Sequence, residues 1–360
     1  MTVATTSLTG ASAPKTPVAP DQPPAGAAGP TSHAHRYERV LAEQARRTWP
    51  ALPEADVAAA VDAGMLAQAI GPTASDPTPG VGAAAAIGEA AATVQRQGLP
   101  ASTPVDWSSF GLVIPVLAGS PGAGASVLAA MIADTVQLVG NRTLLVDAAD
   151  PVRSGLAMAA RHAGPWSRGP HPAISIRYSW RAQALLAQLE TWLPVVAPGM
   201  VPSPRFWHPG VNLHVTVVDV GQDSWRLAAH PLVGAGEWLR SGSPSPRPIL
   251  VVRATRPSLA HAEQALARLE PWISAGAATA PAQLVVMGAK RWPSGAAGSA
   301  GRRVATLMAN AVFVPYHSAT VVGGVDPSVT PRPLRNAVTP LLRSWGVLGS
   351  RRRTHEGVPS

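Results

Sequence analysis

The hydrophobic pattern of the chain changes after Trp107. From there on, short apolar runs alternate with longer stretches in which apolar residues recur at three- and four-residue steps. Short continuous runs are typical of buried strands, and the longer period is typical of helices. We predict strands at residues 112–117, 143–146, 213–218, 249–252, 283–287 and 312–314, with a further short strand at 194–197.

Helical patterns follow most of these runs. They span residues 126–139, 226–240, 258–273, 301–310 and 334–345, and another helix is predicted at 180–193, inside an insertion at 161–210. Strands that alternate with helices indicate an α/β fold, a doubly wound and mostly parallel sheet with helices on both faces. Pro115 departs from the pattern because proline has no N–H for a central strand, so the strand is expected to start there or to bulge.

The first third of the chain differs in composition and in hydrophobic pattern. Residues 1–33 hold almost no large apolar side chains, so we expect a disordered arm. Residues 34–72 show two amphipathic stretches that predict a small helical hairpin, and residues 73–106 have the Pro, Gly and Ala content of a linker. The α/β domain is expected at 107–347, followed by a basic tail at 348–360.

Composition narrows the possible chemistry. The chain has no cysteine, which excludes disulfides, cysteine-ligated zinc and a thiol nucleophile. No apolar run reaches the roughly 18 residues of a membrane span, and the first 30 residues lack a signal-peptide pattern, so the cytoplasm is the expected location. The net charge is +9, and nearly all of the positive charge comes from arginine, since lysine occurs only at positions 15 and 290. This balance favours a polyanionic partner, either nucleic acid or an acidic membrane surface.

A glycine-rich loop lies between the first predicted strand and its helix. Its sequence at residues 119–126 is Gly-Ser-Pro-Gly-Ala-Gly-Ala-Ser, and this context is typical of a P-loop, where backbone N–H groups and a helix N-terminus bind phosphate. The pattern G-x-x-x-x-G-K-[ST] places a lysine where this chain has Ala125. The predicted nucleotide-binding residues are Gly119, Ser120, Gly122, Gly124, Ala125 and Ser126.

Carboxylates follow two of the predicted strands. Asp147 and Asp150 come just after the second strand, and Asp219 comes directly after the strand at 213–218. An aspartate at the carboxyl end of a strand beside a phosphate loop is where Mg²⁺ or its water ligands are held. With the hydroxyl of Ser126, these three acids are the predicted Mg²⁺ ligands, although each alone is also typical of a turn or helix cap.

Together these motifs resemble the ParA/MinD family of P-loop ATPases, whose loop has the form K-G-G-x-G-K-[ST]. Residues 120–126 correspond to that loop, and both family lysines are missing, at Ser120 and Ala125. Residues 144–151 resemble the family's L-L-I-D-x-D-P motif, and residues 215–221 resemble its Walker B strand. Further similar segments extend the resemblance to about residues 107–347.

The resemblance implies ATP and Mg²⁺ as ligands, a homodimer, and a protein partner. Because the lysines are missing, we expect hydrolysis to be weak or absent. The leading hypothesis is a degenerate family member that binds DNA or a partner protein in a partitioning, conjugation or secretion system. One alternative is a slow ATPase with a substitute cation, for which Arg153 and Arg256 are candidates. The other is an interaction scaffold that binds no nucleotide.

The last third of the chain is rich in arginine. These residues suit non-specific contacts to DNA phosphates, which weaken steeply with salt, although a solvated surface explains them equally well. The predicted nucleic-acid contacts are Arg302, Arg303, Arg332, Arg335, Arg351, Arg352 and Arg353. The predicted helix at 334–345 is amphipathic, so it either packs on the sheet or makes peripheral contact with an anionic membrane.

Overall fold

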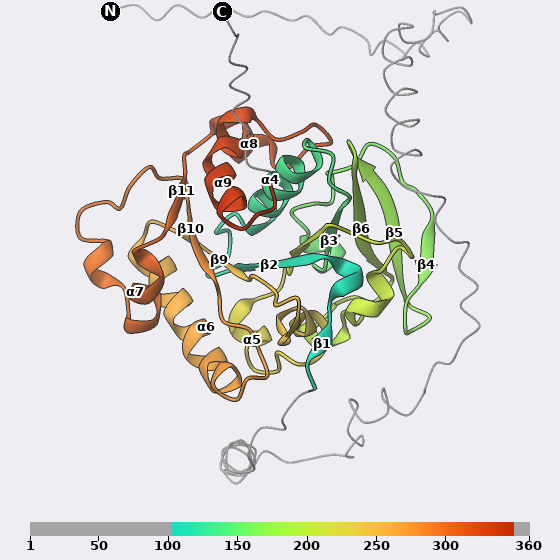
Figure 1. Ribbon diagram of the computed structural model, residues 1–360, viewed down its shortest axis with the longest axis horizontal. Coiled ribbons are helices and arrows are strands. Elements are labelled where there is room, and N and C mark those ends of the chain that lie inside the picture. The colour runs from blue at the N-terminus through green and yellow to red at the C-terminus, as the bar shows by residue number, and fades with distance from the viewer. Residues whose placement is uncertain (1–102, 349–360) are drawn as a thin grey trace, which may run out of the picture. The chain divides into compact units, whose positions relative to one another are not determined.

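The computed structural model describes residues 103–348, and its centre is a nine-stranded sheet (Figure 1). In order across the sheet the strands are β11 (Val312–Val314), β10 (Gln283–Met287), β9 (Ile249–Arg253), β2 (Leu112–Ala118), β7 (Val215–Asp219), β3 (Thr143–Asp147), β6 (Ala184–Thr191), β5 (Ile174–Arg181) and β4 (Trp166–Arg168). All pairs from β11 to β6 are parallel, and β5 and β4 continue antiparallel. The predicted α/β class with a mostly parallel sheet is confirmed.

Helices cover both faces of the sheet. The α-helices are α4 (Ala125–Gln137), α5 (Ser224–Leu227), α6 (Arg256–Ser274), α7 (Arg302–Met308), α8 (Ser318–Gly323) and α9 (Arg332–Ser344). The helices α4 and α9 lie on one face, and α5 and α6 lie on the other (Figure 1). A two-stranded parallel sheet, β1 (Val105–Asp106) with β8 (Gly242–Ser243), lies apart from the main one.

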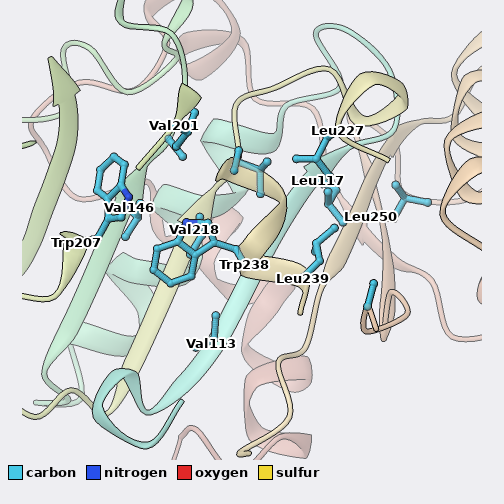
Figure 2. Close-up of a cluster of buried hydrophobic side chains, with 14 of the residues drawn as sticks. Val113, Leu117, Val146, Val201, Trp207, Val218, Leu227, Trp238, Leu239 and Leu250 are labelled. Carbon is cyan, nitrogen blue, oxygen red and sulfur yellow. The ribbon is translucent and has the colours of Figure 1, made fainter. Parts of the chain in front are cut away.

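Alternation along the central strand divides the core into two clusters. Val113 and Leu117 of β2 face the α6 side, whereas Ile114 and Val116 face α4 and α9. On the α6 side, both side chains belong to the core cluster that includes the buried indole of Trp238 (Figure 2). Both faces of β2 are therefore apolar, which is why the sequence shows a continuous apolar run there.

The predicted helix at 180–193 is wrong. That segment ends β5 and forms β6, which pairs in parallel with β3. Six consecutive residues of β6 are buried, so both of its faces are covered and no alternation of apolar and polar residues is visible in the sequence. Ala182, with φ of 52°, makes the turn between the two strands. The insertion therefore widens the sheet.

Other predicted elements are shorter or absent. The helix expected at 226–240 is only α5 and a 3₁₀ helix, η5 (Gly234–Leu239), because Pro231 lies between them. No strand forms at 194–197. At the ends, β1 lies in the segment predicted as linker, and Leu348 is buried although predicted to begin the tail. The arm at 1–33, the hairpin at 34–72 and most of the tail lie outside the described residues.

Pro115 lies inside β2, which starts at Leu112 and neither starts late nor bulges at the proline. Successive N–H groups in a strand face opposite neighbours: Leu112 donates to His214 on the β7 side, and Gly119 donates to Val251 on the β9 side. The nitrogen of Pro115 consequently faces β9, whose register with β2 begins one residue later, at Val116. Just before β9, the backbone N–H of Arg247 donates to the carbonyl of Val113 at 2.9 Å, so the missing donor lies between this bond and the register that begins at Val116.

A buried ion pair joins the insertion to α4. The guanidinium of Arg181 donates to both oxygens of Asp134, from Nε at 3.1 Å and from Nη2 at 2.9 Å. Arg181 also donates to the carbonyl oxygens of Ala159 at 3.2 Å and Ser328 at 2.7 Å, and the N–H of Thr330 donates to Asp134 at 2.7 Å. Because both charges are buried and fully engaged, the pair fixes how α4, β5 and the segment before α9 meet.

The apolar face of α9 is buried. Leu334, Val338, Leu341 and Leu342 belong to the core cluster that includes α4. Of the two alternatives for this helix, packing in the fold is confirmed, and the predicted peripheral membrane contact through its apolar face is wrong. None of the helices at 103–348 is long and apolar enough to span a bilayer.

Candidate phosphate-binding site

The phosphate loop connects β2 to α4 at the carboxyl edge of the sheet, as predicted. Its first residue, Gly119, donates its N–H to the carbonyl of Val251 at 2.7 Å. A Cβ at Gly119 would lie 2.9 Å from Cγ1 of Val252 and 3.0 Å from Cβ of Ala262, so only glycine fits between β9 and α6. The entrance to the loop is therefore fixed by packing.

Two glycines give the loop its curvature. Gly122 has φ of 66° and Gly124 has φ of 100°, both in the left-handed region that glycine adopts without strain. No side chain caps the N-terminus of α4. The first N–H groups of a 13-residue helix are thus left for another acceptor, and together with the positive end of the helix dipole they favour an anion.

The two residues that stand where the family has lysine both turn into the protein. The hydroxyl of Ser120 lies 2.7 Å from that of Ser258, at the start of α6, and Ser120 is only 9% exposed. Ala125 is 8% exposed, and its methyl group belongs to the core cluster around α4. Neither side chain offers a charge to a phosphate in the loop.

Two predicted Mg²⁺ ligands lie side by side. Asp147 of β3 and Asp219 of β7 are register partners at the ends of adjacent strands, and both are buried. Asp147 accepts hydrogen bonds from the hydroxyl of Ser154 at 2.5 Å and from the amide of Gln188 at 3.3 Å. Within the described structure, neither oxygen of Asp219 has a hydrogen bond of good geometry.

This arrangement alters the acidity of both carboxyls. Burial, followed by the charge of Asp147, raises the pKa of Asp219 to about 7, while the nearby Ser126 hydroxyl and Gly221 backbone N–H partly oppose the rise. Burial also raises the pKa of Asp147, against the hydrogen bonds from Ser154 and Gln188. An unpartnered buried carboxylate is costly, and a cation or its water ligands would relieve that cost. The donor set of Ser126 and Asp219 thus fits Mg²⁺.

Asp150 and Ser126 are more constrained than the sequence predicted. The oxygens of Asp150 accept from the backbone N–H groups of Val152 at 3.1 Å and Val196 at 3.0 Å, so this side chain ties two loops together. A Cβ at Gly155 would lie 2.5 Å from the Ser126 hydroxyl oxygen, so the chain after β3 covers that hydroxyl closely. Among the described residues, no group of three or more His, Cys, Asp or Glu forms a metal site by itself.

Neither predicted substitute cation contacts the loop in the described structure, but a different arginine does. Arg153 is exposed, and Arg256 donates to the carbonyl of Gly295 at 3.4 Å. Arg253, the last residue of β9, donates from Nε to the carbonyl of Gly122 at 2.8 Å. Sequence reasoning missed Arg253, although its place after the apolar run at 249–252, at a strand's carboxyl end, was a usable signal.

The predicted nucleic-acid residues are separated in the structure. Arg303 pairs with Glu263 at 3.1 Å and with Glu270 at 2.5 Å, and Arg302 pairs with Glu270 at 3.4 Å. Their charges are therefore partly compensated. Arg335 donates to the carbonyl of Thr330 at 2.8 Å, and Arg332, at the start of α9, is exposed. Arg351, Arg352 and Arg353 lie outside the described residues.

Large apolar side chains are exposed near the loop, at the same edge of the sheet. Val152 follows β3 and is 90% exposed, and Trp192 and Val195 follow β6. Val152 and Val195 are held near each other because Asp150 bonds the N–H of Val152 and that of the residue after Val195. Clustered exposed apolar groups are typical of a surface that contacts another macromolecule.

No model of a known protein family matches the sequence, and no curated protein matches it. Among solved structures, the fold is similar to a chain of the MinC:MinD cell division protein complex of Aquifex aeolicus, with 16% identity, a TM-score of 0.42, and coverage of 69% of this chain and 98% of that one. It is also similar to a nucleotide-binding protein in complex with ADP from Archaeoglobus fulgidus, with 14% identity, a TM-score of 0.40, and coverage of 63% and 92%. At these identities and TM-scores, neither likeness carries an argument about activity.

Proposed function

We propose that this protein is a ParA/MinD-like nucleotide-binding protein that hydrolyses ATP weakly or not at all. On this proposal it acts as a DNA- or partner-binding component of a partitioning, conjugation or secretion system. The observation that carries the proposal is the left-handed loop at Gly122 and Gly124, set before the uncapped N-terminus of α4. The unpartnered carboxyl of Asp219 supports a divalent cation at the same place.

In the proposed complex, the loop N–H groups and the α4 N-terminus hold the phosphates, and Ser126 and Asp219 hold Mg²⁺. The metal would supply charge that neutralises the phosphate oxygens. Weak hydrolysis follows from Ser120 and Ala125, because neither places a charge on the transferred phosphoryl group. The exposed side chains of Val152 and Val195 support a protein partner at the same edge.

Two matched glycine variants test nucleotide binding. Gly122 and Gly276 both have left-handed φ, 66° and 70°, and a Cβ at either position meets nothing within 4 Å. Gly122→Asp places a carboxylate in the phosphate loop, whereas Gly276→Asp places the same charge beyond the end of α6. By calorimetric titration with ATP and Mg²⁺, we expect wild type and Gly276→Asp to bind alike and Gly122→Asp to lose at least about tenfold in affinity.

The outcomes separate the alternatives. If the wild-type protein binds neither ATP nor ADP, with or without Mg²⁺, the proposal is contradicted. The interaction scaffold that binds no nucleotide is then the remaining hypothesis. If wild type and Gly122→Asp bind ATP with equal affinity, the nucleotide binds somewhere other than this loop. Turnover measured on the same samples distinguishes a slow ATPase from a protein that only binds.

A further inference from the structure

Arg253 is held against the phosphate loop through its side chain and its backbone. Its Nε donates to the carbonyl of Gly122 at 2.8 Å. Its backbone N–H donates to the hydroxyl of Ser258 at 3.0 Å, and that hydroxyl lies 2.7 Å from the hydroxyl of Ser120, the second residue of the loop. The guanidinium therefore contacts the loop directly at Gly122, and the backbone of Arg253 is linked to Ser120, which replaces a family lysine, through the hydroxyl of Ser258.

The strand register explains this position. Ala118 at the end of β2 is paired with Val251, so Arg253 extends two residues past the level at which β2 ends. Its register partner on β10 is Met287, whose side chain lies against Gly124, 3.3 Å from where a Cβ would be. The ends of β9 and β10 thus support one flank of the loop, and Arg253 is the charged member of that flank.

In the described part of the chain, two of the three nitrogens of the Arg253 guanidinium are unused. Within residues 103–348, no contact engages Nη1 or Nη2, and the residue is exposed to solvent. A guanidinium stays charged at any physiological pH, and its planar fork matches two phosphate oxygens. The single lysine in that range, Lys290, is exposed and makes no contact with the loop. Arg253 is accordingly the cation that the geometry selects.

We propose that Arg253 binds the β- or γ-phosphate of a nucleoside di- or triphosphate in place of the two missing lysines. This inference rests on the proposed function, because it assumes that the loop holds a nucleotide. It replaces the two arginines that the sequence suggested, Arg153 and Arg256, with a residue bonded directly to the loop. It also explains how the loop retains a positive charge although Ser120 and Ala125 face the interior.

Three variants test the proposal by calorimetric titration of the full chain with ATP and with AMP. Arg253→Ala removes the fork, Arg253→Lys keeps the charge without the fork, and Arg256→Ala removes an exposed arginine three residues along the chain as a matched control. A hydrogen bond to a charged group is worth about 10- to 150-fold in affinity. We expect Arg253→Ala to lose roughly that factor for ATP, Arg253→Lys to lose less, and Arg256→Ala to match wild type.

AMP separates phosphate binding from support of the loop, because it lacks the β- and γ-phosphates. Arg253→Ala is expected to weaken AMP binding at least about tenfold less than ATP binding. Equal losses for both ligands, or unchanged ATP binding, overturn the proposal while leaving a nucleotide site in place. If wild-type protein binds no nucleotide, the proposed function fails, and the inference fails with it. Thermal unfolding of each variant checks that the fold is retained.

Discussion

Replacing the buried carboxyl of Asp219 with an amide is expected to stabilise the ligand-free protein above neutral pH. Burial and the neighbouring Asp147 raise the pKa of Asp219 from its ordinary value of 3.8 to about 7. The folded protein keeps this proton while the unfolded chain releases it, so stability falls as the pH rises from about 4 to about 7. At about 1.4 kcal/mol per pH unit, the penalty is on the order of 4 kcal/mol at pH 8.

The variant Asp219→Asn cannot ionise, so it escapes that penalty. An amide with unmet hydrogen bonds still costs about 1–3 kcal/mol. We therefore expect a net gain of roughly 1–3 kcal/mol in the free energy of unfolding at pH 8 and little or none near pH 5. Asp223→Asn is the matched control, because Asp223 is an exposed helix cap at which asparagine serves equally well.

Urea denaturation at pH 5 and pH 8, in EDTA and without nucleotide, measures the effect. This window lies above the range in which Glu263 matters, since hydrogen bonds from the backbone N–H groups of Val304 and Arg303 and from the Arg303 side chain lower the pKa of Glu263 against its burial. The stability contributed by Glu263 is lost only as the pH falls through that lowered value. If Asp219→Asn and wild type keep the same difference in stability at both pH values, the raised pKa of Asp219 is refuted.

Two further predictions concern charged side chains: a buried ion pair and the binding of DNA. Arg181→Met leaves Asp134 buried without its cation, so we expect a loss of about 3–5 kcal/mol in the free energy of unfolding by urea denaturation, and a loss below 1 kcal/mol would contradict a buried pair. The net charge of +9 predicts a gel shift of duplex DNA at low salt that disappears at moderate salt. Arg332→Ala should weaken this shift more than Arg303→Ala, because Arg303 is already paired with glutamates, and no shift at any salt would exclude DNA.

The sequence predicted the parts of the fold that depend on local pattern. The strand at 312–314 and the loop between β2 and α4 were placed correctly, because apolar runs and glycines mark them directly. The helix predicted at 180–193 failed because β6 is buried on both faces and is rich in Ala, Leu and Gln, which favour helices in isolation. The tertiary pairing with β3 overrides that preference.

The candidate site was only partly predictable for a related reason. Asp147 and Asp219 belong to strand ends, so a parallel sheet brings them together. The partners of other side chains lie far away in sequence: Glu263 is 40 residues from Arg303, and Gly122 is 131 residues from Arg253. No local pattern encodes such contacts, so the sequence alone indicates neither the glutamate partners of Arg303 nor the contact of Arg253 with the loop.

Pro115 has a consequence for folding fidelity. Its nitrogen faces β9 just before the register of the two strands begins at Val116, and the phosphate loop starts four residues after the proline. If β2 slipped by one residue, the ring would turn toward β7, which is paired with β2 from Leu112 onward, and a ladder hydrogen bond would be lost. Pro115 therefore penalises misaligned pairings of the central strand and helps to determine the height at which the loop emerges from the sheet.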